Sequence, residues 1–588
     1  MNFQKRTDTC GNLRMEDVGR HVVLNGWIHR IRNLGGLVFI DLRDRYGITQ
    51  LFVYPEDSPE LAERAKELRP EFVIWATGAV NRRENVNPNL PTGLIEIKID
   101  DFGIINRSEL PPFEISNETE TSEEIKLRYR YLDLRRQSIQ NKLILRNKMY
   151  QIIHKYYEEN DFIEIETPVL MKSTPEGARD FLVPSRINKG RFYALPQSPQ
   201  IFKQILMISG FDRYMQIVKC FRDEDLRSDR QPEFTQVDVE MSFIDENEII
   251  SVTEGLLSAL WKEILGLDIQ TPFLRMSFHE AMTRYGSDKP DIRFGMEIKT
   301  ITGLMMNTGF KVFSDTISGG GTIALINAKG CAGYSRKQLD QLQDFAKKYG
   351  AKGLAWMKQT DGQVNSPIAK FLSIEETRDV LKISDAESND LLLIISDSWN
   401  RCLTALGALR LEIARQTGIL ESVKNEFAFL WITEFPLLEF DPDNNRWIAM
   451  HHPFTSPLSE DLHLMDSQPA KIRARAYDIV VNGAEIGGGS IRIHQSKVQQ
   501  KMFELLGMSP EDAENKFGFL LKALKYGAPP HGGIALGLDR LAMTLSHTDN
   551  IRDVIAFPKT TSGLSLMDGS PSKVDTAQLN DLGLKLME

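Results

Sequence analysis

The sequence predicts a large α+β protein of several domains, with a small β-barrel at its N-terminus. The chain has 588 residues, well past the size at which one hydrophobic core stops growing, so about three or four domains are expected. Short runs rich in Val, Ile and Phe fill residues 1–107, whereas long helical patterns begin only after them. Hydrophobic residues make up 41% of the chain and charged residues 26%, which is typical of a globular protein.

The composition also narrows the class of function. With 71 basic and 81 acidic residues the net charge is −10, which argues against a histone-like DNA coat but not against a nucleic acid bound by a local basic patch. No apolar run approaches the roughly 18–20 residues that span a bilayer, and no secretory signal is recognised, so we expect a cytoplasmic protein without a membrane partner. The cysteines form no CxxC pair, so we expect neither a disulfide framework nor zinc. They are Cys10, Cys220, Cys331 and Cys402.

Residues 1–107 contain five β-type runs and one helical stretch, SPELAERAKEL. The runs are VVLNGWIHRI, LVFIDLRD, ITQLFVY, FVIWATGAVNRR and LIEIKIDDFGII. Five strands at this spacing favour an OB-fold barrel, a fold that commonly binds single-stranded nucleic acid. A barrel with a purely structural role fits the pattern equally well.

The rest of the chain divides into five further segments that differ in residue composition and in hydrophobic pattern. Residues 108–135 are rich in Pro, Ser, Thr and Glu and are predicted to be a hinge, with Thr121 and Glu124 as a capping box for the next helix. A long amphipathic helix and a strand ending at Pro168 open the next segment. The predicted segments are a first part of a central domain at 136–293, an inserted α+β domain at 294–423, a second central part at 424–557 and a peripheral extension at 558–588.

The stretch MQIVKCFRDEDLRSDRQPEFTQVDVEMSF, residues 215–243, predicts an antiparallel hairpin with a long charged turn. Alternation in its second strand places a polar and aromatic set on one face, opposite Val237, Val239 and Met241. That set comprises Phe234, Gln236, Asp238 and Glu240. The arginines and carboxylates between Arg222 and Glu233 favour a nucleotide site, and an ordinary half-solvated sheet is the alternative.

The stretch YDIVVNGAEIGGGSIRIH, residues 477–494, places Ser490 and Arg492 on one strand face. Asp478 and Glu485 are candidate oxygen ligands for Mg²⁺, which favours carboxylates together with substrate phosphates. The GGG run permits close approach to a ligand or forms a turn, and a turn is the better interpretation.

Two further stretches carry candidate charges. In HGGIALGLDRL, residues 531–541, Arg540 falls in the first turn of a predicted helix, where free N–H groups suit a phosphate, although no P-loop is present. In QSPQIFKQ, residues 197–204, Gln200 and Lys203 share a helix face, and a solvated lysine is the alternative. The adjacent His451 and His452 indicate packing or substrate contact rather than zinc.

Taken together, these segments resemble the class II aminoacyl-tRNA synthetases. The long helix with the strand ending at Pro168 resembles their first motif, FRDED…RQPEFTQVDVEMSF the second and GIALGLDRL the third. The nearest members are those for Asp, Asn and Lys, and most closely the bacterial aspartate-specific type, because STPEGARDF and QSPQIFKQ resemble its substrate segments. The insertion, which includes KGLAW, resembles the bacterial GAD domain. The resemblance implies an OB-fold barrel, an antiparallel catalytic sheet and a GAD-like insertion.

It also implies an activity and its residues. Aspartate would be activated by ATP with Mg²⁺ to aspartyl-adenylate and then transferred to the 3′-terminal adenosine of tRNA(Asp). The implied catalytic residues are Arg222, Glu485 and Arg540. The implied aspartate-binding residues are Glu176, Gln200, Lys203, Arg222, Asp238, His451 and Arg492. The implied ATP-binding residues are Arg222, Asp223, Glu224, Gln231, Phe234, Glu485, Gly537, Leu538, Asp539 and Arg540. Asp478 and Glu485 would hold Mg²⁺, and Arg32, Phe39, Gln50 and Glu96 would hold the anticodon.

Alternatives and partners complete the expectations. An asparaginyl- or lysyl-type enzyme is disfavoured by the cations Lys203 and Arg492, and a non-catalytic tRNA-binding paralogue by the intact motif residues. The resemblance implies a homodimer through the first motif. Basic HRIRN and RYRYLDLRR are candidate tRNA patches. Whether tRNA(Asn) is also charged depends on contacts near Leu34 and Arg83 and stays open.

Overall fold

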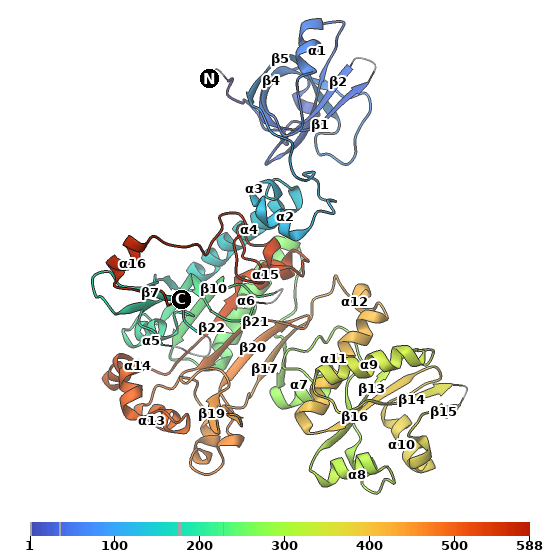
Figure 1. The fold of residues 1–588 in the computed structure, drawn as a ribbon, viewed down its shortest axis with the longest axis vertical. Coiled ribbons are helices and arrows are strands. Elements are labelled where there is room, and N and C mark those ends of the chain that lie inside the picture. Colours follow the sequence, from blue (N-terminus) through green and yellow to red (C-terminus); the bar gives the residue numbers. More distant parts are fainter. Residues whose placement is uncertain (1–2, 35–36, 175–178, 227–228, 361, 588) are drawn as a thin grey trace. The chain divides into compact units, whose positions relative to one another are not determined.

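The computed structural model describes residues 3–587 except 35–36, 175–178, 227–228 and 361. Its chain divides into two compact units (Figure 1). The barrel unit comprises residues up to 148 together with 226–231 and 542–574. The sheet unit comprises residues 149–225, 232–541 and 575–588. No helix among the described residues is both long enough and apolar enough to cross a membrane.

The barrel unit begins with the predicted five-stranded barrel, which is closed and has the strand order β1-β2-β3-β5-β4. Buried and partly buried residues alternate along β1, so one face of each strand fills the barrel core. Helix α1 (Pro59–Ala65) connects β3 to β4, where the helical stretch was predicted. The strands are β1 (His21–Leu34), β2 (Leu37–Asp44), β3 (Gly47–Val53), β4 (Val73–Arg82) and β5 (Ile95–Asn106).

The hinge region of the barrel unit differs from its prediction in two details. Ser122, not Thr121, is the N-cap of α2 (Glu123–Arg128), because its Oγ accepts the N–H of Ile125 at 3.5 Å. Of the arginines in the stretch RYRYLDLRR only Arg128 is exposed. Arg130 in α3 (Arg130–Asp133) is buried and its guanidinium donates to backbone carbonyls, so the stretch is a smaller basic patch than predicted. The long helix is present as α4 (Gln137–Glu159).

The sheet unit is built on an eight-stranded sheet of order β11-β17-β20-β21-β22-β10-β9-β6. Only its two edge pairs, β11 with β17 and β6 with β9, are parallel among the described residues. The predicted hairpin is confirmed, since β9 and β10 pair antiparallel. The strands are β6 (Ile163–Glu164), β9 (Arg213–Phe221), β10 (Glu233–Ser242), β11 (Leu274–Ser277), β17 (Phe429–Thr433), β20 (Ala476–Val481), β21 (Ala484–Ile491) and β22 (His531–Gly537).

The sheet unit also contains helices and small hairpins, and the helices at Gln200–Ile208, Glu246–Leu265 and Phe278–Tyr285 pack against strands of this sheet. The helices are α5 (Gln200–Ile208), α6 (Glu246–Leu265), α7 (Phe278–Tyr285), α13 (Ser496–Leu505), α14 (Pro510–Ala523), α15 (Leu538–Leu545) and α16 (Thr576–Leu582). The hairpins are β7 (Leu182–Pro184) with β8 (Phe192–Ala194), and β18 (Leu438–Asp441) with β19 (Arg446–Ala449). Because of this packing, β10 is buried on both faces from Thr235 onward, and the half-solvated alternative for this strand is wrong.

The GGG run lies inside β21 and not in the predicted turn. A Cβ at Gly488 would lie 2.3 Å from Oδ1 of Asp478, and one at Gly489 would lie 2.1 Å from the carbonyl oxygen of Gly533. Neither contact is possible for a real Cβ, so these glycines let adjacent strands and the Asp478 carboxylate approach closely.

Residues 299–422 form an α+β body of their own within the sheet unit. Its five-stranded sheet has the order β12-β13-β16-β14-β15. The predicted Lys-rich helix is α9 (Arg336–Lys348), which begins with a capping box between Ser335 and Gln338. The strands are β12 (Lys299–Thr300), β13 (Thr322–Ala328), β14 (Ala355–Thr360), β15 (Gln363–Asn365) and β16 (Leu391–Asp397). The other helices are α8 (Lys311–Ser318), α10 (Ile374–Ile383), α11 (Trp399–Gln416) and α12 (Ile419–Ser422).

Arg410 of α11 joins this α+β body to the segment that precedes it in the chain, residues 291–295. Its Nη2 donates to the carbonyls of Asp291, Phe294 and Gly295 at 2.7, 2.8 and 3.0 Å. Its guanidinium also lies over the rings of Phe294 and Tyr285, 4.0 and 5.0 Å from their centroids. Burial lowers the pKa of Arg410 to about 10, so the side chain stays charged at neutral pH.

We expect Arg410→Met to destabilise the sheet unit by about 3 kcal/mol, because buried carbonyls would lose their donor while the side-chain stem is kept. Differential scanning calorimetry measures the change. The matched control is Arg415→Met on the same helix, whose exposed pair with Glu412 predicts a change within about 0.5 kcal/mol. Equal effects of the two substitutions would contradict this role of Arg410.

Candidate active site

Four charged side chains meet in the middle of the sheet unit. Lys203 comes from α5, Asp238 and Glu240 from β10, and Arg492 from the residue after β21. The Nζ of Lys203 lies 3.0 Å from Oδ1 of Asp238 and 3.2 Å from Oε2 of Glu240. The Nε and Nη2 of Arg492 donate to the two carboxylate oxygens of Glu240 at 2.9 and 3.0 Å. We call these four residues the charge cluster.

The charge cluster is almost completely removed from water, since none of its members is more than 2% exposed. Burial and the neighbouring Glu240 raise the pKa of Asp238 to about 6, although Lys203 opposes the shift. Burial also acts to raise the pKa of Glu240, but Arg492 and Lys203 outweigh it and the pKa is lowered. Two cations therefore balance two carboxylates at neutral pH.

The remaining arm of Arg492 contacts neutral groups. Its Nη1 donates to Oγ of Ser490 at 2.6 Å and lies 2.7 Å from Nε2 of His452. Burial, and then the charge of Arg492, hold the pKa of His452 well below its usual range, so the imidazole is neutral. His452 thus lies against Arg492, whereas the predicted His451 lies 3.7 Å from Asp478 and packs on the ring of Phe435.

The other predicted aspartate-binding residues are Gln200 and Glu176. Gln200 is the first residue of α5 and is 5% exposed, and its Nε2 has no hydrogen-bond partner among the described residues. A buried amide without a partner is costly, so this atom suits contact with a polar ligand. Glu176 lies outside the described residues.

Arg222 and Phe234, two of the predicted nucleotide-binding residues, lie together where the hairpin turn joins β9 and β10. The guanidinium of Arg222 is 5.0 Å from the centroid of the Phe234 ring, and the Arg222 N–H donates to the carbonyl of Pro232. An aromatic ring beside a fixed cation can hold a base by stacking and a phosphate by charge. Asp223 is exposed and Glu224 is half-buried in the same turn.

The predicted phosphate and Mg²⁺ ligands are Arg540 and two carboxylates, Asp478 and Glu485. Arg540 in the first turn of α15 donates from Nη1 to the carbonyl of Glu485 at 2.8 Å. Burial, and then the charge of Asp478, raise the pKa of Glu485. A divalent cation would relieve the repulsion that the Asp478 charge exerts on Glu485, and Mg²⁺ needs only one or two carboxylates beside phosphates. No cluster of three or more possible metal ligands occurs among the described residues.

Several predicted ATP-binding residues serve the fold through their side chains. Asp539 is buried and accepts the N–H of Thr235 at 2.8 Å, and Leu538 is fully buried. Gly537 pairs with Gln236 in the sheet. In the barrel unit, the Gln231 amide is joined to the backbone of Lys559 in both directions, at 2.7 and 3.0 Å.

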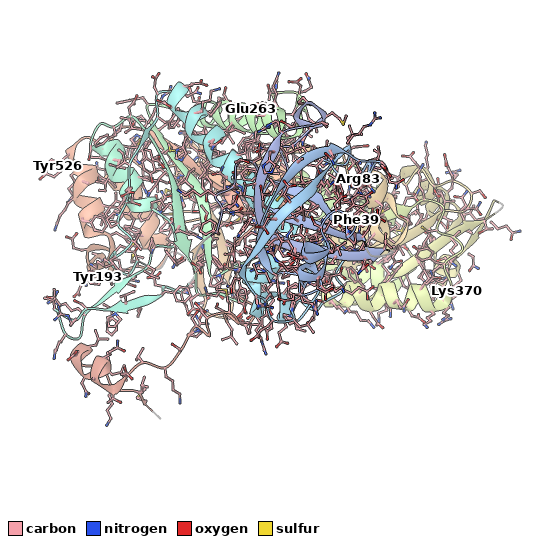
Figure 2. All side chains as sticks on the ribbon, turned by 90° about the horizontal axis from the view of Figure 1, so that it is seen from above. Phe39, Arg83, Tyr193, Glu263, Lys370 and Tyr526 are labelled. Carbon is pink, nitrogen blue, oxygen red and sulfur yellow. The ribbon has the colours of Figure 1, made fainter. Side chains whose placement is uncertain are left out.

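The structure brings all four predicted anticodon residues together on the barrel. Arg32 donates to Oε1 of Gln50 at 2.9 Å, and Gln50 donates to Oε2 of Glu96 at 2.7 Å. The guanidinium of Arg32 lies 6.0 Å from the centroid of the Phe39 ring. Figure 2 shows Phe39 and Arg83 on the barrel. Burial raises the pKa of Glu96, although the bond from Gln50 and the charge of Arg83 oppose this shift. A ring beside a polar row suits unpaired bases.

Comparisons with known proteins agree with this geometry. The family described as tRNA synthetases class II (D, K and N) matches residues 122–561, and the family described as OB-fold nucleic acid binding domain matches residues 22–105. The chain therefore belongs to the class II aminoacyl-tRNA synthetases of the D, K and N group, enzymes whose general reaction is two-step aminoacylation with ATP.

The family model covers enzymes for three amino acids, whereas the relatives that align over the full length of the chain are named for aspartate. The chain is 54% identical over 583 residues to the aspartate–tRNA(Asp/Asn) ligase of Geotalea uraniireducens (strain Rf4), covering 99% of this chain and 98% of that one. It is 51% identical over 588 residues to the aspartate–tRNA ligase of Clostridium perfringens (strain 13 / Type A), covering 100% and 98%.

Solved structures share the fold. One is the asparaginyl-tRNA synthetase of Pyrococcus horikoshii complexed with asparaginyl-adenylate, with a TM-score of 0.57, 20% identity and coverage of 93% and 96%. Another is the aspartyl-tRNA synthetase of Entamoeba histolytica, with a TM-score of 0.57, 17% identity and coverage of 92% and 89%. At these identities the likeness concerns the fold alone.

We expect Glu240→Gln to destabilise the sheet unit by about 3–5 kcal/mol, because Lys203 and Arg492 would face a single buried carboxylate. Urea unfolding followed by tryptophan fluorescence measures the change. Glu246→Gln is the matched control: Glu246 also receives two bonds from one arginine, Arg475, but both side chains are partly exposed. If Glu240→Gln lowers the free energy of unfolding by no more than Glu246→Gln does, the charge cluster is not a major contributor to stability.

Proposed function

We propose that this chain is an aspartate–tRNA ligase, which activates L-aspartate with ATP and transfers it to tRNA(Asp). One observation carries the choice of aspartate: within the part of the chain that the structure describes, the Nη1 arm of Arg492 contacts two neutral acceptors, His452 and Ser490. A substrate carboxylate is a stronger acceptor than either and can take this arm while Glu240 keeps the rest of the guanidinium. An amide or an ammonium side chain offers no such gain.

The first step is attack of the aspartate α-carboxylate on the α-phosphate of ATP, with release of pyrophosphate. No covalent protein nucleophile is required, so positioning and charge stabilisation supply the catalysis. Phe234 would stack on the adenine, Arg222 would bind the α-phosphate and Arg540 the γ-phosphate. Mg²⁺, held by Asp478 and Glu485 with the phosphates, would neutralise charge that develops on the leaving pyrophosphate. Gln200, Asp238 and Glu176 would orient the substrate ammonium.

In the second step the terminal ribose hydroxyl of tRNA attacks the activated carbonyl, and AMP leaves. The barrel would hold the anticodon through Arg32, Phe39, Gln50 and Glu96. The relatives' names differ in including tRNA(Asn). Charging of purified tRNA(Asp) and tRNA(Asn) side by side decides this point for the present chain.

The assembly and the domain borders belong to the same proposal. We infer a cytoplasmic homodimer, and the sheet unit supports a dimer because it exposes large apolar side chains on β6 and on neighbouring segments. These are Ile163 at 49%, Leu170 at 51%, Phe211 at 42% and Phe243 at 75% exposure. The domain division given from the sequence, with an insertion at 294–423, also remains a proposal.

Pyrophosphate exchange tests the amino-acid specificity. Wild-type exchange should require aspartate, ATP and Mg²⁺. Arg492→Lys keeps a cation beside Glu240 but loses the fork that serves Glu240 and a substrate carboxylate together, so the aspartate-to-asparagine ratio of kcat/KM should fall roughly ten- to hundredfold. Robust wild-type exchange with asparagine or lysine, or an unchanged ratio in the variant, would refute the assignment.

Phe39→Ala separates the barrel from the chemistry. Stacking of a base on one ring contributes roughly 1–3 kcal/mol, so kcat/KM for tRNA charging should fall about five- to hundredfold. Exchange without tRNA should stay unchanged, because Phe39 belongs to the barrel. Tyr46→Ala, an exposed ring at the β2–β3 turn outside the polar row, is the control. Parallel loss of both activities in Phe39→Ala would mean that the barrel is structural.

A further inference from the structure

A buried carboxylate joins the barrel to the hinge. The Nη2 of Arg43 lies 2.9 Å from both carboxylate oxygens of Glu71, and the Nη1 of Arg135 donates to Glu71 Oε2 at 2.8 Å. Arg43 belongs to β2, whereas Arg135 lies in the hinge just before α4. We call these three residues the hinge triad. All of them lie in the barrel unit.

The carboxylate of the hinge triad is held in a fixed geometry. Glu71 is 5% exposed and has a φ of 64°, in the left-handed region that non-glycine residues rarely adopt. Two backbone bonds hold this conformation: the Glu71 N–H donates to the carbonyl of Ile28 at 2.7 Å, and the Ile28 N–H donates to the carbonyl of Phe72 at 2.9 Å. A strained residue that is fixed in this way indicates that the position of its side chain matters.

Arg135 is fixed on both sides. Its guanidinium pairs with Glu71 and lies 5.1 Å from the centroid of the Trp27 ring, and Trp27 pairs with Arg43 across β1 and β2. Its side chain is 28% exposed, compared with 7% for Arg43. Removing the Arg135 side chain would therefore leave the buried pair of Arg43 and Glu71 intact, and the barrel core would keep its charge balance.

A second clamp continues from the hinge. Arg136 and Arg130 both donate to Asp133, at 2.7 and 2.5 Å, and Arg130 also donates to the carbonyls of Arg552 and Ile555 at 2.7 and 2.8 Å. Residues 552–555 follow α15, the helix that carries Arg540. Arg130, Arg135 and Arg136 thus join the barrel, through the hinge, to residues 552–555 of the same unit.

We propose that Arg135 is a positioning residue for tRNA. This inference rests on the proposed function, in which one tRNA is held at its anticodon by the barrel and at its 3′ end by the adenylate site. The second contact is intramolecular once the first has formed, and its effective concentration depends on how stiffly the two sites are joined. By fixing the hinge segment against Glu71 and Trp27, Arg135 stiffens the connection between barrel and hinge, and a stiffer connection raises the effective concentration of the tRNA 3′ end.

The test measures three activities of the full-length enzyme carrying Arg135→Lys, Arg135→Ala or Arg135→Glu. Charging of full-length tRNA should fall in that order, with kcat/KM about tenfold lower for Arg135→Ala and lower still for Arg135→Glu, which opposes Glu71. Aspartate-dependent pyrophosphate exchange without tRNA should be unchanged. Affinity for an isolated anticodon stem-loop RNA should also be unchanged, because the barrel face is intact.

The matched control is Arg107→Ala. Arg107 likewise pairs with a glutamate, Glu67 at 2.9 Å, and lies 5.7 Å from the ring of Phe72. Unlike Arg135, however, Arg107 belongs to the barrel segment itself, so its pair does not connect the barrel to the hinge. Its charging activity should stay at the wild-type level. Normal charging by Arg135→Ala, or a parallel fall in exchange or in stem-loop affinity, would overturn the inference. Absence of aspartate-dependent exchange in the wild type would instead refute the proposed function.

Discussion

The charge balance among Lys203, Asp238, Glu240 and Arg492 is the interaction on which the sheet unit depends. Each of these groups alone would cost several kcal/mol to bury, so the cluster is stable only when all four keep their partners. Because its members come from α5, β10 and the end of β21, these elements cannot shift independently. The site is thereby rigid before any substrate arrives, which is the condition for catalysis by positioning.

Close strand packing provides the second condition. Gly488 and Gly489 have no room for a Cβ, so β20, β21 and β22 approach one another and bring Asp478 and Glu485 to one side of the sheet. Arg540 lies beside these strands, and its guanidinium donates a hydrogen bond to the backbone carbonyl of Glu485. The carboxylates are therefore placed by strands and the arginine by the first turn of α15, not by a flexible loop.

The sequence predicts much of this architecture because its signals are local. Alternating β-type runs gave the barrel and the hairpin, and helical periodicity gave α4. Partners distant in the sequence were not predictable: Arg130 bonds a carbonyl 422 residues away, so its run of arginines resembled an exposed patch. Likewise Glu240 was placed on the correct strand face, but its pairing with Arg492, and that of His452, required the fold. The GGG run resembled a turn because glycine flexibility and glycine smallness leave the same sequence signal.

Buried arginines have two different roles in this chain. The nature of their acceptors indicates which arginine is suited to bind a substrate. Arg130 and Arg410 are buried donors to backbone carbonyls, and burial lowers the pKa of each. Their acceptors are fixed parts of the fold, so no ligand can replace them. Arg492 has a carboxylate on one edge and the side chains of Ser490 and His452 on the other. A substrate carboxylate is a stronger acceptor than Ser490 or His452 and can replace them as the partner of Arg492. Among these three arginines, Arg492 is therefore the one suited to bind an anionic substrate.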